Sequence, residues 1–188
     1  MAVTVITPPA TEPCSLTEIK AQLGQTLDTD DTLIGRKITA AREYVERMTG
    51  RTLIDTTLEL VLDVFPRAAI AVPNGPLSSV TSVTYIAADG TETVLDSGAY
   101  TVDTDSDRIA PGDDGWPSTD SAINAVRVRY VAGYGDEATD VPEPLREAIL
   151  LLSAHWYENR EATLVGLSAQ SLPYGVDAVI NQYRVWSF

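Results

Sequence analysis

Few side chains in this sequence are of the types that perform chemistry. The one histidine, His155, lies beside Trp156 in an apolar helical pattern, which favours a packed, hydrogen-bonded side chain over a catalytic base. The one cysteine, Cys14, lies in a proline-rich extended segment with no histidine nearby in the sequence. Ser168 partly resembles the nucleophile of a strand-turn-helix elbow, but the closing glycine is missing and no strand precedes it. We therefore expect no catalytic residue.

A series of acids is the remaining chemical candidate. Asp103, Asp105 and Asp107 alternate as the first ligands of a calcium loop do, and Asp114 falls at the twelfth position. Arg108, however, stands where the sharp turn of such a loop needs glycine, which favours a solvated hairpin loop. The sequence also lacks a phosphate-binding glycine loop and a Cys/His cluster, so we expect no metal and no cofactor.

The chain is strongly acidic. Its 27 acidic and 13 basic residues give a formal net charge of -14, which argues against a surface that grips nucleic acid, because such surfaces carry clustered Lys and Arg. The acids crowd the middle third of the chain, where we expect a negative surface. That surface is either a solvated face or a wall past which DNA moves without binding.

The length and the other sequence signals point to a soluble protein of the cytoplasm. The 188 residues suit one domain, or one domain with a sizeable insertion. A lone cysteine cannot form an internal disulfide, which fits a reducing compartment. No apolar run is long enough for a signal or a membrane span, so we expect no membrane contact.

Helical patterns occupy both ends of the sequence. Ser15 and Glu18 have capping-box spacing before a short helix that reaches about Leu23. A longer amphipathic helix follows an acidic start at residues 28–31 and ends at Gly50. Prolines at 142 and 144 begin a third helix that runs to about residue 162, and a short one covers 176–183. We expect the core to include Leu33, Ile38, Val45, Leu145, Ile149, Leu152 and Trp156.

Strand patterns occupy the middle of the sequence. Apolar residues alternate over 56–64, and further strands are predicted at 80–86, 92–95, 100–102 and 126–131. Residues 103–121 are predicted to form a long polar loop. The fold class is therefore α+β, with a helical core of about four helices formed by residues 1–55 and 139–188 and an antiparallel β insertion at 56–138.

The C-terminus is rich in the residue types that concentrate binding energy at interfaces. This segment either folds back onto its own core or contacts a partner. The residues expected at such an interface are Tyr183, Arg184, Trp186 and Phe188.

Two stretches resemble the head-tail adaptor (connector, head completion) proteins of bacteriophages and gene transfer agents. The first joins Ser-Leu-Thr-Glu-Ile-Lys at 15–20 to Ala-Ala-Arg-Glu-Tyr-Val-Glu at 40–46. The second joins Tyr-Val-Ala-Gly-Tyr-Gly at 130–135 to the helix with His-Trp-Tyr-Glu-Asn-Arg-Glu at 155–161. The order and spacing of these pieces carry the resemblance.

The resemblance implies a structural virion assembly protein that is not an enzyme. It would form a ring, commonly of twelve copies, in the particle neck between portal and stopper or tail, and would be assembled in the bacterial cytoplasm. The aromatic C-terminus would bind the portal protein, and DNA would pass through the ring without specific binding. The acids expected to face the channel or the next ring are Asp103, Asp105, Asp107, Asp113 and Asp114.

Two alternatives remain open from the sequence. One is another neck part, such as a stopper or a tail terminator. The other is a small cytoplasmic enzyme or a sugar-binding β module, which would need a concave cluster of aromatic residues on one sheet face. The candidates for that cluster are Tyr85, Tyr100, Trp116 and Tyr130.

Overall fold

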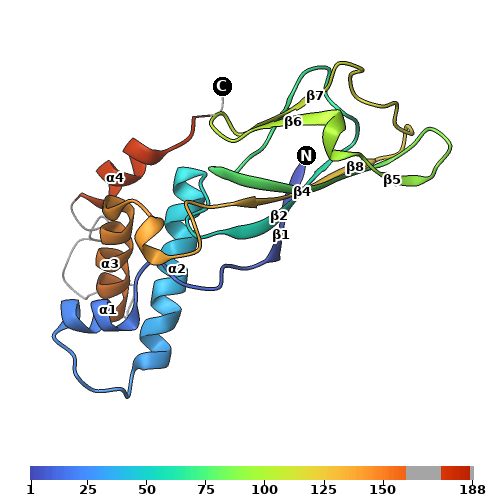
Figure 1. Ribbon diagram of the computed structural model, residues 1–188. Coiled ribbons are helices and arrows are strands. Elements are labelled where there is room, and N and C mark those ends of the chain that lie inside the picture. The colour runs from blue at the N-terminus through green and yellow to red at the C-terminus, as the bar shows by residue number, and fades with distance from the viewer. Residues whose placement is uncertain (160–174, 187–188) are drawn as a thin grey trace, which may run out of the picture. The chain divides into compact units, whose positions relative to one another are not determined.

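The computed structural model describes residues 1–159 and 175–186, which form two compact units (Figure 1). The sheet unit comprises residues 1–10 and 55–136, and the helical unit comprises residues 11–54 and 137–188. The predicted α+β fold with helices at both ends and antiparallel sheet between them is confirmed. Residues 1–10 belong to the sheet unit, where they add a strand.

The sheet unit contains a five-stranded and a three-stranded antiparallel sheet. The strand order is β1-β2-β8-β4-β5 in the larger sheet and β3-β7-β6 in the smaller one. In the larger sheet the strands are β1 Ala2–Thr7, β2 Thr56–Leu62, β8 Val126–Ala132, β4 Leu77–Ile86 and β5 Glu92–Val94. In the smaller sheet they are β3 Ile70–Ala71, β7 Arg108–Pro111 and β6 Tyr100–Asp103.

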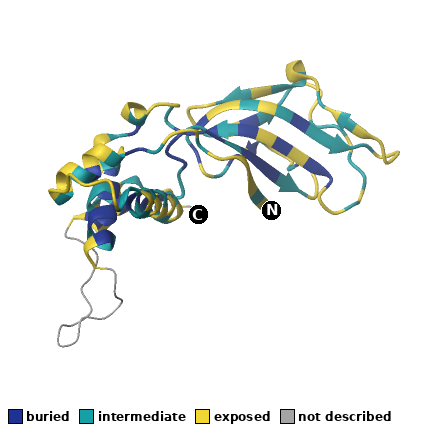
Figure 2. Ribbon diagram, turned by 90° about the horizontal axis from the view of Figure 1, so that it is seen from below, coloured by how far each residue is buried: buried dark blue, intermediate teal, exposed yellow. Residues whose placement is uncertain are grey.

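The central strand β8 shows the alternation that a half-buried strand requires. Val126, Val128 and Tyr130 point into the core, whereas Arg127 and Arg129 are exposed on the opposite face, as Figure 2 shows for the strands of this unit. The core is built from both sheets, because Ile70 and Ile109 of the smaller sheet are buried in the same apolar cluster as β8. One face of the larger sheet is therefore apolar and the other is polar.

Three strands differ from the prediction. The strand β1 was expected only as an extended start, and β7 lies inside the segment 103–121 that was predicted to be a loop. Residues 108–111 pair with β6 and contribute a fully buried Ile109, but four residues are too few to show a period. The two-residue strand β3 has no period at all.

The helical unit contains α1 Leu16–Leu23, α2 Asp31–Thr49, α3 Glu143–Glu158 and α4 Val176–Tyr183, with the short 3₁₀ turn η2 Ala138–Asp140 before α3. The capping box of Ser15 and Glu18 is confirmed, and Gly50 ends α2 in the left-handed conformation expected there. Asp30 is the N-cap residue of α2, but its carboxylate accepts a hydrogen bond from Tyr157 instead of capping the helix. No described helix has the length and apolar character that a membrane span needs.

The core of the helical unit is formed mainly by one buried apolar stripe on α2 and one on α3. Of the seven residues expected in it, Ile38, Val45, Leu145, Ile149 and Leu152 are buried. Leu33 and Trp156 are only half-buried.

The two exceptions have separate reasons. Ile34 begins the buried stripe of α2, and Leu33 lies about 100° away from it around the helix. Trp156 lies at the rim of the core, where its ring meets Tyr44 edge-on with the centroids 5.8 Å apart, while the following residue Tyr157 is buried.

We expect Leu152→Ala to destabilise the protein by about 2 to 5 kcal/mol, because it leaves a cavity in a fully buried site. Trp156→Ala should cost less than about 3 kcal/mol, because this side chain is only partly buried. Leu27→Ala, at an exposed position, is the control and should change stability by less than about 0.5 kcal/mol. Urea unfolding of the three variants measures their free energies of unfolding. Equal losses of stability in Leu152→Ala and Trp156→Ala would contradict the prediction.

Candidate functional site

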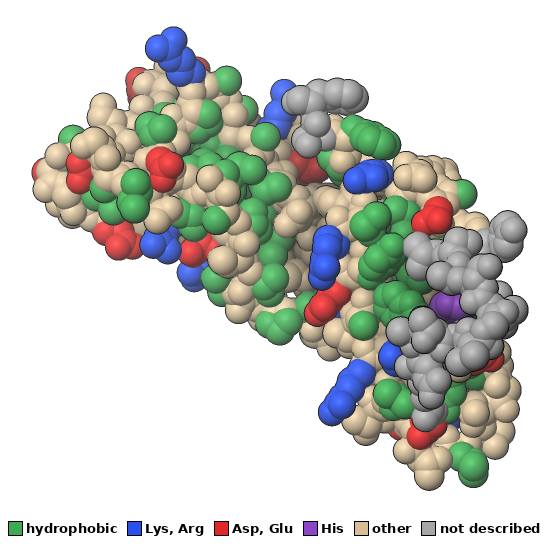
Figure 3. Space-filling model, turned by 180° about the vertical axis from the view of Figure 1, so that it is seen from behind, with side chains coloured by type: hydrophobic (Ala, Val, Ile, Leu, Met, Phe, Trp, Pro, Cys, Tyr) green, Lys and Arg blue, Asp and Glu red, His purple; other side chains and the backbone are tan. Residues whose placement is uncertain are grey.

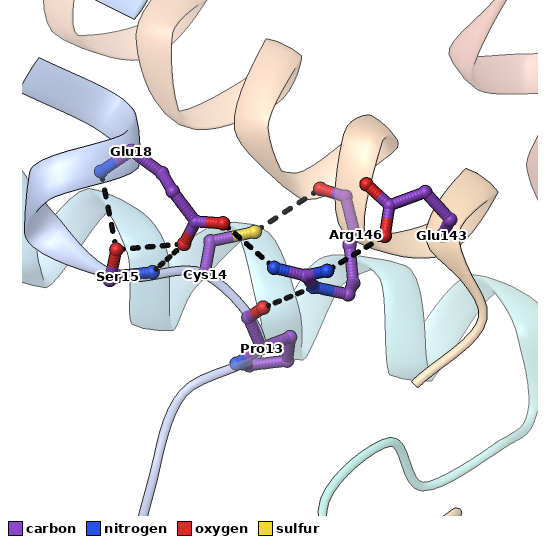
Figure 4. Close-up of polar contacts among 6 residues, drawn as sticks. All are labelled: Pro13, Cys14, Ser15, Glu18, Glu143 and Arg146. Carbon is purple, nitrogen blue, oxygen red and sulfur yellow. Dashed lines mark hydrogen bonds and ion pairs between the residues drawn. The ribbon is translucent and has the colours of Figure 1, made fainter. Parts of the chain in front are cut away.

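The N-terminal segment is fastened to α3 through one arginine (Figure 4). Arg146 donates from Nε to the Pro13 carbonyl at 2.9 Å, from Nη2 to Glu18 at 2.7 Å and from Nη1 to Glu143 at 2.7 Å. The thiol of Cys14 in turn donates to the Arg146 carbonyl at 3.2 Å. All of these bonds except the one to Glu143 join residues more than a hundred positions apart in the sequence, so they position residues 13–18 against α3 rather than a substrate.

Glu18 connects this arginine to the start of α1. One of its carboxylate oxygens accepts from the backbone N–H and the hydroxyl of Ser15, and the other accepts from Arg146. The backbone N–H of Ser15, followed by its hydroxyl and by the Arg146 charge, holds the pKa of Glu18 below its ordinary value. The capping box and the ion pair therefore share one ionised carboxylate.

The residues with nucleophilic or basic side chains are not brought together. Burial raises the pKa of the Cys14 thiol to about 12, which leaves it protonated near neutral pH. The Cys14 thiol contacts α3 at Arg146, and His155 lies nine residues further along this helix. The two side chains are therefore separated by about 13 Å along the helix axis. The His155 ring lies 3.2 Å from the Asn159 amide, a neighbour on the same helix. Ser168 lies outside the described residues.

The five acids singled out in the sequence have different environments. Asp107 accepts a hydrogen bond from the Leu77 N–H at 2.6 Å, and Asp103 pairs with Arg108 at 2.8 Å, so both stabilise the local backbone or a hairpin. Asp105, Asp113 and Asp114 are exposed. Within the described part of the chain, His, Cys, Asp and Glu side chains do not gather in any group of three or more that could hold a metal ion.

The aromatic residues of the rival β-module hypothesis pack inward. Tyr130 is fully buried and its hydroxyl donates to the Pro73 carbonyl at 2.9 Å. Tyr85, Tyr100 and Trp116 are partly buried against the same core cluster. They therefore do not line a concave sugar-binding face on the larger sheet.

The C-terminal segment is anchored by its backbone while its side chains stay exposed. The Arg51 side chain donates to the Tyr183 carbonyl at 2.7 Å, and the Val185 N–H donates to the Thr49 carbonyl at 2.8 Å. Trp186 is 61% exposed, and the Arg184 guanidinium lies 5.0 Å from the centre of its ring.

The exposed apolar side chains of this anchored segment are Val185 and Trp186. Of the four residues expected at this interface, Phe188 lies outside the described residues.

A charged cluster on the open face of the larger sheet was only half visible in the sequence. Arg127 and Arg129 are two residues apart within the strand predicted at 126–131, so they share one face, but their acidic partner lies on another strand. Glu59 of β2 lies between them, with its two oxygens 3.2 Å from Arg127 and 2.9 Å from Arg129. The register that pairs Glu59 with Arg129 could not be read from either strand alone.

Comparison with known proteins assigns the chain to a family and a fold. The family model described as head completion protein matches residues 14–186. Among solved structures, a chain from the neck of an empty gene transfer agent particle, computed with C6 symmetry, has a TM-score of 0.83 and 24% identity, covering 100% of this chain and 97% of that chain.

Two further solved structures agree with this match. A chain from the virion of a native gene transfer agent particle gives the same TM-score of 0.83, 24% identity and coverage of 100% and 97%. A chain from the neck of a native particle, computed with C12 symmetry, has a TM-score of 0.76 with the same 24% identity and coverage of 100% and 97%. No curated protein matches the chain.

The protonated, buried Cys14 should resist alkylation in the native protein. We expect iodoacetamide at pH 8 to leave the thiol unmodified while the chain is folded and to modify it fully in urea, as mass spectrometry would show. A Cys14→Ser variant is the control for labelling elsewhere. Rapid alkylation of the folded protein would contradict the burial of this side chain.

Glu18 should make stability depend on pH. Because its pKa is lowered in the folded state, its contribution is present above the ordinary value of 4.5 and is lost as the pH falls below it. We expect Glu18→Gln to lower the free energy of unfolding at pH 7 by about 1 kcal/mol or less, since the side chain is partly exposed. The difference between variant and wild type should shrink toward pH 3, and a difference that stays constant would contradict the assignment.

Proposed function

Because the chain belongs to the head completion protein family, we propose that it forms a ring in the neck of a phage or gene transfer particle, between the portal and the stopper or tail. The observation that supports this most is the likeness of the fold, over the whole chain, to a neck chain from a particle computed with C12 symmetry. A ring of twelve copies around the DNA path is the assembly that follows. The protein would act by binding, without catalysis.

The anchored C-terminal segment supports a role in contacting the portal protein. Tyr183, Arg184 and Trp186 belong to the residue types that dominate interface energies, and the backbone bonds from Arg51 and to Thr49 hold the segment in place. A pre-ordered segment loses less entropy on binding than a free tail does. We propose that Phe188 continues the same contact.

The acidic surface supports a DNA path that does not bind its cargo. A net charge of -14 repels phosphate within the screening distance of about 8 Å at physiological salt. The exposed Asp105, Asp113 and Asp114 are better placed than Asp103 and Asp107 for facing the channel or the next ring, because the latter two are engaged by local partners.

Replacement of the exposed indole tests the portal contact. We expect Trp186→Ala to weaken binding of the portal protein by about 2 kcal/mol or more, roughly thirtyfold, if Trp186 is a hot spot. Its free energy of unfolding should stay within about 0.5 kcal/mol of wild type, because the anchoring bonds are made by backbone groups. Native mass spectrometry of the protein with its portal measures the binding.

The matched control for this test is Leu27→Ala. It removes a side chain that is 68% exposed, on the same helical unit but outside the C-terminal segment. The two variants losing portal binding equally, or neither losing it, would contradict a specific role of Trp186.

A further inference from the structure

The open face of the larger sheet holds a site suited to anions. A hollow of about 390 Å³ on this face is lined by two guanidiniums, two hydroxyl groups and two carboxylates. They belong to Arg127, Arg129, Ser82, Thr84, Glu59 and Glu92. Arg127 is 53% exposed and Arg129 is 45% exposed, so both present N–H groups to the solvent.

The charges around this hollow do not cancel on the β8 side. Glu59 accepts from both Arg127 and Arg129, so one negative charge lies between two positive charges. Each guanidinium has five N–H donors, and each uses only one of them on Glu59. Glu92 lies on β5, two strands from β8 and therefore about 10 Å away across the sheet.

The same chain carries an exposed pair of adjacent acids, Asp113 and Asp114. Asp113 and Asp114 are the middle residues of a tight turn in which the Gly115 N–H donates to the Gly112 carbonyl at 3.0 Å. Side chains at the middle of such a turn project into the solvent. Alternate residues on a strand lie about 6.6 Å apart, so Arg127 and Arg129 can each meet one carboxylate of an adjacent acidic pair.

We propose that the Asp113–Asp114 turn of one copy docks on Arg127 and Arg129 of the next copy around the ring. This inference rests on the proposed ring, since a ring needs two different, complementary surfaces on every subunit. It places Asp113 and Asp114 at the subunit interface instead of at the channel. The occupant is a second copy, because every subunit carries both the exposed acidic turn and the two arginines, and a ring brings neighbouring subunits into contact.

The proposed contact would add one more ion pair to a surface of mixed charge. Several Lys and Arg side chains lie directly beside Asp and Glu side chains on the face drawn in Figure 3. An isolated exposed ion pair contributes little, about 0 to 1 kcal/mol, but a ring repeats the same contact at every interface. Its main effects are the register between neighbours and the salt dependence of assembly.

Charge reversal on either side tests the docking. Asp113→Lys with Asp114→Lys changes only an exposed turn, and Arg127→Glu changes the receiving face. We expect each to weaken ring assembly about tenfold at low salt, and the combination of both to recover part of the loss. Ring formation of the full-length chain, alone and on the portal, is measured by native mass spectrometry and sedimentation.

Two controls carry the same charge changes elsewhere on the sheet unit. Arg67→Glu matches Arg127→Glu, and Asp63→Lys with Asp89→Lys matches the turn variant; all three positions are exposed and outside the proposed contact, so both controls should assemble like wild type. Thermal unfolding of Arg127→Glu checks that it folds, and the turn variant carries the test if it does not. Assembly of wild type should also weaken as salt approaches 1 M, where the screening length is about 3 Å.

The outcomes separate the docking from the ring itself. A wild-type chain that forms no ring, alone or with portal, overturns both proposals. A wild-type ring that the turn variant leaves intact overturns the docking alone. If Arg127→Glu weakens binding of duplex DNA but not the ring, the arginines contact phosphate and the docking is again overturned.

Discussion

The helical unit depends on the packing of α3 against the helices that precede the sheet. Its two segments, residues 11–54 and 137–188, are separated in the sequence by most of the sheet unit. Neither segment can bury its apolar stripe alone, so Ile34 and Val45 of α2 need Leu145 and Leu152 of α3. Arg146 adds directional bonds to this packing, because it joins Pro13 and Glu18 to the first turn of α3. The position of every segment on the helical unit, including the C-terminal segment, therefore depends on the packing of α3 against α2 and on the Arg146 bonds.

The glycines of the Tyr-Val-Ala-Gly-Tyr-Gly stretch have a comparable role in the sheet unit. Gly133 has a φ of 151°, and a Cβ at this position would lie 2.5 Å from the backbone nitrogen of Asp55. That nitrogen donates to the Gly135 carbonyl at 2.9 Å, while the Gly133 N–H donates to Pro76. The end of β8 therefore approaches two other segments so closely that no side chain fits at 133. In the sequence, this stretch was only part of the family resemblance. The structure shows that steric crowding requires its glycine at position 133.

Local signals were enough to predict the elements with a cap or a clear period. The Ser15 and Glu18 box and the Gly50 stop are determined by neighbours in the sequence and are confirmed. The alternation over 56–64 correctly predicted a strand, but Glu59 is buried along with Leu58 and Leu60, and the strand ends at Leu62. Interactions between distant segments were not predictable. The pairing of β1 with β2, the buried Ile109 of β7 and the position of Glu59 between two arginines all depend on the register between strands. Exposure of the C-terminal side chains was left open for the same reason, since it depends on where Arg51 and Thr49 hold the backbone.

The charge of the protein limits which contacts between copies can be favourable. Subunits with a net charge of -14 repel one another in a ring, so contacts between copies must bury apolar surface or pair opposite charges. Several cations of the helical unit are already engaged at short distance, as Lys20 is with Asp28 and Asp31 and Arg42 is with Glu12 and Glu46. On the sheet face, by contrast, the two guanidiniums of Arg127 and Arg129 both pair with the one carboxylate of Glu59. Two guanidiniums that share one carboxylate are therefore a place where a neighbouring copy can supply a compensating acid.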